Sequence, residues 1–245
     1  MNNLNSIKYI NSLNLTLSEN EVHIWYADMT KSKKISEEFL SVLSFDEKIK
    51  LNHFYFEKDK VIFVASRSIL RMLLGFYTGL NPREIRLSYG PYGKPFLEAG
   101  SNINFNISHS NQFILLAFTK KRMIGADIEY IQKVDVESIM QQFSSPQEYS
   151  TFCNLDELHK QKSFFKWWTR KEAYIKATGT GLMQCLKDFD VSITPDTEAK
   201  ILSIKGCSKK ANQWSLKELS IDSSYVSTIC VEKPIEKYSS FKWSF

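Results

Sequence analysis

The feature that most constrains the fold is an order of predicted elements that occurs twice along the 245 residues. Two long helices are predicted, at Asp59–Tyr77 and at about Asp156–Thr178, and each is followed by glycines that would end it. Each long helix follows a predicted strand and short helices, and each precedes further strands. This shared order predicts an α+β fold of two pseudo-symmetric halves, with a ligand site in the cleft between them.

Alternating apolar patterns and turn residues predict the other elements. The boundary between the halves is placed near Lys120–Arg122, which gives halves of residues 1–120 and 121–245. Ser44, followed three residues later by Glu47, has the spacing of a helix capping box. The predicted strands are Val22–Ala27, Asn104–Ser108, Phe113–Thr119, Met123–Tyr130, Phe189–Ile193, Lys200–Ile204, Gln213–Leu219 and Val226–Val231, and the short helices are Ser36–Leu43, Asp46–Phe56, Val136–Phe143 and Pro146–Asn154.

Composition narrows the class of protein. A hydrophobic fraction of 43% and an aromatic fraction of 13% support a sizeable core and exclude a disordered chain. The net charge of +5 suits an anionic partner or simple solubility equally well. The polar first 20 residues are unlike a secretory signal, and no run approaches the ~20 apolar residues of a transmembrane helix. The four scattered cysteines form no CxxC pair, and the four histidines lack zinc-ligand spacing, so we expect a reduced, cytoplasmic protein.

The strongest candidates for chemistry are three carboxylates and a lysine. On a strand, Asp127 and Glu129 point to one face, and apolar flanks predict a central strand, where unpaired charges are costly unless a metal binds them. Glu172 and Lys176 lie one helical turn apart, on one stripe with Trp168. Together they describe a site for a divalent cation such as Mg²⁺ that holds a phosphate. The alternative for Glu172 and Lys176 is a surface ion pair.

Polar groups in the first half are candidates for holding phosphate oxygens. Ser108 and His109 lie where a predicted strand ends, although a histidine satisfied within its turn is the alternative. Lys94 lies in a glycine turn that lacks the P-loop pattern but could still reach a phosphate as a point charge. Arg67 and Arg71 are spaced to share one helix face, toward the cleft or toward solvent.

Two further charges, Arg170 and Lys171, lie in the second long helix next to Glu172. We interpret them as ordinary solvated helix charges.

Four segments in order resemble the surfactin-type 4′-phosphopantetheinyl transferases. They are Tyr92–Pro95, Phe105–Ser110, Ile124–Glu129 and Trp168–Lys176, with a weaker fifth match at Phe143–Glu148. The resemblance implies a monomer with coenzyme A and Mg²⁺ in the cleft between two α+β halves, the first half on the nucleotide side. It also implies transfer of the 4′-phosphopantetheine arm to a serine of an apo acyl or peptidyl carrier protein, with release of adenosine 3′,5′-bisphosphate.

The resemblance also implies residue roles. Asp127, Glu129 and Glu172 would be the metal-site carboxylates, Lys176 would contact the reacting phosphate, and Glu172 would bind metal, take a proton, or do both. By the resemblance, Lys94, Ser108 and His109 would hold the nucleotide. Arg67 and Lys50 are further candidates for the same side.

One position departs from the family pattern. Ile62 aligns where many members carry an arginine for the 3′-phosphate of coenzyme A. Either Lys60, Arg67 or a lysine of Glu47–Lys50 substitutes for it, or the binding of coenzyme A is altered.

Two other functions use the same residues. The first is a metal-dependent phosphohydrolase that acts on coenzyme A or a related diphosphate with water as the nucleophile. The second is a binding protein without catalysis, against which the intact carboxylates and Lys176 argue. We expect neither a nucleic-acid nor a membrane partner.

Overall fold

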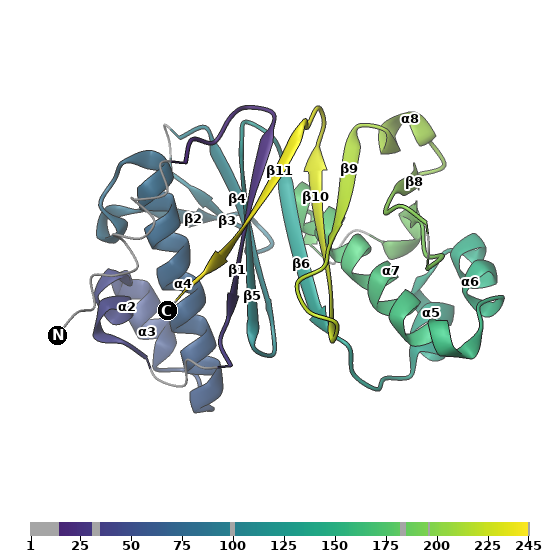
Figure 1. Cartoon of the computed structure of the whole chain (residues 1–245), viewed down its shortest axis with the longest axis horizontal. Coiled ribbons are helices and arrows are strands. Elements are labelled where there is room, and N and C mark those ends of the chain that lie inside the picture. The colour runs from purple at the N-terminus through teal and green to yellow at the C-terminus, as the bar shows by residue number, and fades with distance from the viewer. Residues whose placement is uncertain (1–14, 31–34, 99–100, 182–184, 196, 245) are drawn as a thin grey trace.

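The computed structural model describes residues 15–30, 35–98, 101–181, 185–195 and 197–244. Two sheets meet near the middle of the molecule, with α4 covering one outer side and α7 the other (Figure 1). The first part contains β1 (Glu21–Asp28), α2 (Glu37–Val42), α3 (Phe45–Leu51), α4 (Glu57–Thr78), β2 (Leu87–Tyr89), β3 (Pro95–Leu97), β4 (Ile103–Ser110) and β5 (Phe113–Lys120). The mixed helices and sheets confirm the predicted α+β class.

The second part of the chain follows β5. It contains β6 (Ile124–Tyr130), α5 (Val136–Phe143), α6 (Pro146–Cys153), α7 (Glu157–Thr178), β7 (Phe189–Val191), β8 (Ile201–Ile204), α8 (Ser208–Ala211), β9 (Trp214–Leu219), β10 (Tyr225–Glu232) and β11 (Lys237–Trp243). Single 3₁₀ turns lie at Pro82–Glu84 and Leu186–Asp188.

The last strand returns to the first part of the chain. The first sheet has the order β11-β1-β5-β4, and β11 runs parallel to β1 with Lys237 opposite Glu21. The sequence patterns did not predict β11. Residues 237–243 therefore complete the sheet of the first half, and the division into residues 1–120 and 121–245 stays a prediction.

The strand that carries Asp127 lies at the edge of its sheet. The second sheet has the order β6-β10-β9, with Asp127 opposite Thr228 of β10. Within the described residues β6 has no backbone ladder on its other side, where it lies beside β4. The prediction of a central strand was therefore wrong, although β6 is covered by α7 and contacts β4 and β5.

Three apolar clusters hold the molecule together. One lies between α4 and the first sheet, and another between α7 and the elements of the second part. The third joins the two sheets and includes Val22 and Ile24 of β1 together with Ile128 of β6 and Ile229 of β10, all without exposed surface. The two halves therefore share buried surface with each other.

The predicted capping box at α3 is confirmed. The Ser44 hydroxyl accepts from the Glu47 amide at 3.3 Å, and the Glu47 carboxylate accepts from the Ser44 amide at 3.0 Å. The same carboxylate binds Arg71 at 2.6 Å, and Arg71 also donates to the carbonyls of Pro82 and Ile85. With 2% of its surface exposed, Arg71 is a buried connector between α3, α4 and the following turn.

Of the described helices, α4 alone is long and apolar enough to cross a membrane. In the structure 67% of that stretch is buried inside the molecule, which is the pattern of a core helix.

Candidate active site

A close contact between α7 and β6 creates the site. An added Cβ at Gly125 would lie 2.0 Å from the carbonyl oxygen of Ala173 and 2.3 Å from the amide nitrogen of Ala177. Only glycine leaves room for the helix backbone at this distance from the strand. The contact brings Glu172 and Lys176 over the strand, beside the carboxylates that follow Gly125.

Asp127 lies at the centre of the cluster. It is 2% exposed, and its Oδ1 accepts from Lys176 Nζ at 2.6 Å and from the Ser108 hydroxyl at 3.1 Å. Its Oδ2 is buried without a hydrogen-bond partner in the described part of the chain. Burial raises the pKa of Asp127 above its ordinary value, against the opposing effect of Lys176.

Glu129 and Glu172 complete the group. Glu129 accepts from the Ser110 hydroxyl at 3.0 Å, and Glu172 Oε1 is buried without a partner among the described residues. The pKa of each glutamate is raised, first by burial and then by the negative charge of Asp127. Sequence reasoning thus brought together four residues that the structure also brings together.

These carboxylates have the chemistry of a divalent-cation site. Hard oxygen ligands suit Mg²⁺, and a cation would relieve both the mutual repulsion and the unpartnered buried oxygens. As they stand, no three acidic, histidine or cysteine side chains in the described ranges enclose a common point closely enough for an ion. The ammonium group of Lys176 instead neutralises Asp127 directly.

His109 lies at the rim, at the end of β4 near the start of α4. The His109 side chain is exposed at the surface, and the pKa of its imidazole is lowered by partial desolvation and by the cations Lys176 and Arg67. His109 lines a hollow of about 700 Å³ with Ile62 and Lys58 of α4. Ile62, the position that departs from the family pattern, therefore lines the same hollow as His109. Lys58 is a cation in this hollow that sequence reasoning did not identify.

Arg67 and Lys50 lie together in a second hollow. This hollow has a volume of about 720 Å³ and is also lined by Tyr89. The Arg67 guanidinium lies 5.9 Å from the ring centres of both Phe63 and Tyr89, which is a cation–π distance. Both predicted nucleotide-side cations therefore border open space.

Lys94 is placed differently from the other candidates. Its ammonium group donates to the carbonyl oxygens of Ile124 at 3.0 Å and Ala177 at 2.9 Å. Burial lowers the pKa of Lys94 to about 8. The lysine ties the start of β6 to the end of α7, and its role in holding a nucleotide stays a prediction.

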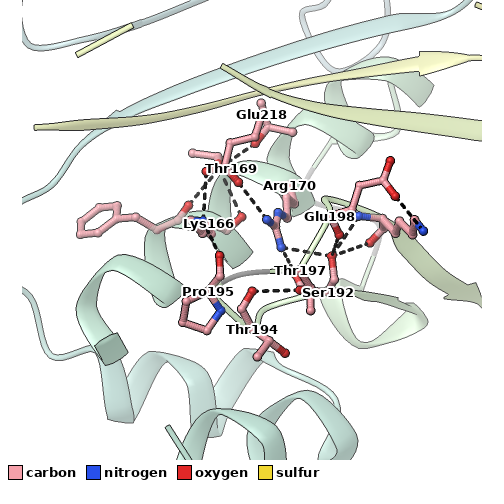
Figure 2. Close-up of polar contacts among 12 residues, drawn as sticks. Lys166, Thr169, Arg170, Ser192, Thr194, Pro195, Thr197, Glu198 and Glu218 are labelled. Carbon is pink, nitrogen blue, oxygen red and sulfur yellow. Dashed lines mark hydrogen bonds and ion pairs between the residues drawn. The ribbon is translucent and has the colours of Figure 1, made fainter. Parts of the chain in front are cut away.

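Arg170 and Lys171 are buried, so the prediction of solvated charges was wrong. Figure 2 shows Arg170 beside Ser192 and Glu218; it donates to the Ser192 hydroxyl at 3.1 Å and to Glu218 at 2.9 Å. Lys171 pairs with buried Glu148 at 2.9 Å. Arg170 and Lys171 lie on one stripe of the helix with Trp167 and Tyr174. These two aromatic residues were the signal of burial that the sequence offered.

Comparisons with known proteins give the family. Residues 30–121 match the 4′-phosphopantetheinyl transferase N-terminal family, and residues 123–230 match the 4′-phosphopantetheinyl transferase superfamily. The 4′-phosphopantetheinyl transferase HetI of Nostoc sp. is 38% identical over 222 residues, covering 89% of this chain and 90% of HetI. The 4′-phosphopantetheinyl transferase Sfp of Bacillus subtilis is 29% identical over 209 residues, covering 85% and 91%.

More distant proteins match as well. The mouse L-aminoadipate-semialdehyde dehydrogenase-phosphopantetheinyl transferase is 31% identical over 209 residues, covering 77% of this chain and 67% of that protein. The solved Thermotoga maritima holo-[acyl-carrier-protein] synthase is 15% identical, with a TM-score of 0.35 over 45% of this chain and 62% of that chain. From its similarity to HetI over nearly its whole length, the chain belongs to the surfactin-type 4′-phosphopantetheinyl transferases, and it is an enzyme.

Proposed function

We propose that Asp127, Glu129, Glu172 and Lys176 form the phosphoryl-transfer centre of this enzyme, with Mg²⁺ as the bound ion. An enzyme of this class moves the 4′-phosphopantetheine arm of coenzyme A to a serine hydroxyl of an apo acyl or peptidyl carrier protein. The observation that supports the proposal best is the group of carboxylates with raised pKa values and unpartnered buried oxygens next to Lys176. A bound cation would remove much of the cost of keeping these buried carboxylates ionised.

The reaction forms one phosphorus–oxygen bond and breaks another. The carrier serine oxygen attacks the phosphorus that bears the pantetheine arm, and adenosine 3′,5′-bisphosphate leaves with the electrons of the broken bond. Bound Mg²⁺ would supply positive charge to the diphosphate oxygens as negative charge develops on them. Asp127, Glu129 and Glu172 would hold it.

Glu172 is the side chain best suited to take the serine proton. Its raised pKa makes it a stronger base than an ordinary glutamate, and one of its oxygens has no partner in the described residues. Lys176 is bound to Asp127 and to the Ser108 hydroxyl at 3.1 Å. Lys176 would contact the reacting phosphate, and a metal ion held by the carboxylates would supply the positive charge that Asp127 needs.

The nucleotide end of coenzyme A would lie against the first half. His109 and Arg67 would bind phosphate oxygens, together with Lys50, which lines the same hollow as Arg67. Ser108 and Lys94 remain candidates for the same end. We further propose a cytoplasmic monomer without nucleic-acid or membrane partners.

Substitution at Asp127 tests this proposal. The enzyme, coenzyme A, Mg²⁺ and an apo carrier protein are incubated, and intact-mass spectrometry measures addition of the arm to the carrier. We expect Asp127→Ala to abolish transfer while the melting temperature is retained. Asp190→Asn is the matched control, because Asp190 also accepts a serine hydrogen bond, at 2.6 Å from Ser203, but on β7. Normal transfer by Asp127→Ala at limiting Mg²⁺, or coenzyme A consumption without carrier modification by the parent enzyme, would contradict the proposal.

A further inference from the structure

Side chains, in place of a backbone ladder, join the two sheets at the active site. β4 and β6 lie side by side, but in the described residues their amides and carbonyls form no ladder with each other. Alternate residues of β4 bridge the gap instead, while Phe105 and Ile107, which point to the other face of the strand, pack with the core under α4. We call these bridging residues the seam: Asn106, Ser108 and Ser110.

The three seam residues make different contacts. The Asn106 side-chain oxygen accepts from the backbone amide of Ala126 at 2.9 Å, and this contact is buried. Ser108 donates to Asp127, as described above. Ser110 accepts from the backbone amide of Tyr130 at 3.0 Å and donates to Glu129 Oε2 at 3.0 Å.

The geometry of Ser110 fixes the direction of its hydroxyl hydrogen. A serine hydroxyl has one hydrogen to donate and lone pairs that accept. Because the oxygen of Ser110 already accepts from the Tyr130 amide, its hydrogen is left for the carboxylate of Glu129. The hydroxyl therefore connects the side chain of Glu129 to the backbone of the next residue on the same strand.

We infer that Ser110 is a positioning residue that holds Glu129 in the orientation needed to bind the metal ion. This inference rests on the proposed function, which assigns Glu129 to the ion. Groups that hydrogen-bond to metal ligands orient them, and their loss typically weakens metal binding by about 10–100-fold. Without the hydroxyl, the repulsion from Asp127 and Glu172 would turn Glu129 away from the shared space.

The seam itself supplies a comparison. Asn106 joins the same two strands through a backbone amide alone, so its contact holds the sheets together without orienting a carboxylate. A purely structural role for Ser110 would make its loss resemble the loss of Asn106. If Ser110 is a positioning residue, its loss weakens metal binding. Asn106→Ser, at the same stability, then leaves metal binding unchanged.

The test uses two variants of this chain whose new side chains have the same shape. Ser110→Thr keeps the hydroxyl, and Ser110→Val replaces it with a methyl group on the same branched side chain. The measurements are Mn²⁺ affinity in the presence of coenzyme A, from electron paramagnetic resonance of the free ion, and melting temperature. We expect roughly tenfold weaker Mn²⁺ binding for Ser110→Val and near-parent binding for Ser110→Thr.

A distant serine–glutamate pair serves as the control. Ser239 of β11 donates to Glu21 of β1 at 2.7 Å, again between neighbouring strands. Ser239→Ala should bind Mn²⁺ like the parent. The inference is overturned if Ser110→Val binds Mn²⁺ like the parent, or if Ser110→Thr and Ser110→Val lose affinity equally.

The same titration separates this inference from the function on which it rests. Parent-like Mn²⁺ binding by Asp127→Ala would remove the metal site itself, and with it the role of Ser110. Loss of binding in Asp127→Ala combined with parent-like binding in Ser110→Val would remove the positioning role alone.

Discussion

At the scale of single residues, buried ionisable side chains differ in how completely their polar atoms are paired. Asp127 and Lys171 are both buried and each has an ion-pair partner. Lys171 also donates to two backbone carbonyls, whereas the second oxygen of Asp127 has no partner in the described chain. Glu172, adjacent to Lys171 in sequence, resembles Asp127 in this respect. An unpartnered oxygen on a buried carboxylate that lies among other carboxylates makes the group a candidate for binding a cation.

Glu172→Gln distinguishes a catalytic role from an ion pair. The substitution keeps shape and polarity but removes a negative charge and a base, so we expect kcat to fall by at least ~100-fold. The melting temperature without ligand should stay the same or rise, because repulsion between like charges is relieved. Turnover and melting are measured on the same preparations.

The control for this prediction lies on the same helix. Glu157 forms an exposed ion pair with Lys160 at 2.9 Å, so Glu157→Gln should leave kcat unchanged. A parallel loss of activity and melting temperature in Glu172→Gln would indicate that Glu172 is structural.

His109→Ala tests the nucleotide end. We expect it to weaken binding of coenzyme A by roughly tenfold to a hundredfold, the scale of a charge-assisted hydrogen bond, and to weaken binding of 3′-dephospho-coenzyme A much less. Calorimetric titration with both ligands makes the comparison. Equal losses for the two ligands would show that His109 does not contact the 3′-phosphate.

At the scale of secondary-structure elements, the site depends on how closely α7 approaches β6. Gly125 permits this approach, and Lys94 holds the end of α7 by donating to the carbonyl of Ala177. On the opposite side of α7, Arg170 and Lys171 attach the helix to the second part of the molecule. These contacts fix the rotation of α7 about its axis, and that rotation determines where Glu172 and Lys176 point.

Gly125→Ala should disturb both stability and catalysis. The added methyl group would overlap the α7 backbone, and an overpacked contact of this kind typically costs about 1–3 kcal/mol. Denaturant unfolding and turnover are the measurements. Gly90→Ala is the control, because its Cβ would meet its nearest neighbour at an ordinary 3.7 Å. Unchanged stability and turnover in Gly125→Ala would mean that α7 can shift without affecting the site.

At the scale of the whole molecule, the C-terminal strand closes the structure on its N-terminal half. Glu21 of β1 lies where β11 is attached: it accepts from Ser239 of β11 and pairs with Lys237 at 2.9 Å. Burial alone would raise the pKa of Glu21, but its partners lower the pKa to about 2. The attachment of the last strand therefore depends on an ionised glutamate.

This attachment predicts a pH-dependent stability difference between the parent and Glu21→Gln. Since folding depresses the pKa of Glu21, its ionisation stabilises the fold fully above the unfolded value of about 4.5 and loses this effect as pH falls toward 2. Denaturant unfolding should find the variant less stable at pH 7, with the difference shrinking between pH 4.5 and 2.

Glu198→Gln is the control for the pH series. Glu198 pairs with Lys200 at 2.8 Å on the surface, where an exposed pair contributes little. A difference between the parent and Glu21→Gln that stays constant across the acid range would contradict the prediction.

The sequence by itself determined the long helices, most of the strands and the local spacing of the four candidate site residues, because these depend on local periodicity and caps. The capping box at Ser44, the glycine ends of α4 and α7, and the spacing of Asp127 from Glu129 and of Glu172 from Lys176 are of this kind. Hydrophobic spacing and short-range hydrogen bonds leave a readable pattern within a few residues.

Tertiary structure alone decided the contacts between segments that are distant in the chain. The pairing of β11 with β1 joins residues separated by 216 positions, and the burial of Arg71, Arg170 and Lys171 depends on partners from other elements. The edge position of β6 and the seam beside it are of the same kind. The sequence does not show whether a charged side chain is solvated by water or paired with a distant carboxylate. Only the packing of the folded chain decides between the two.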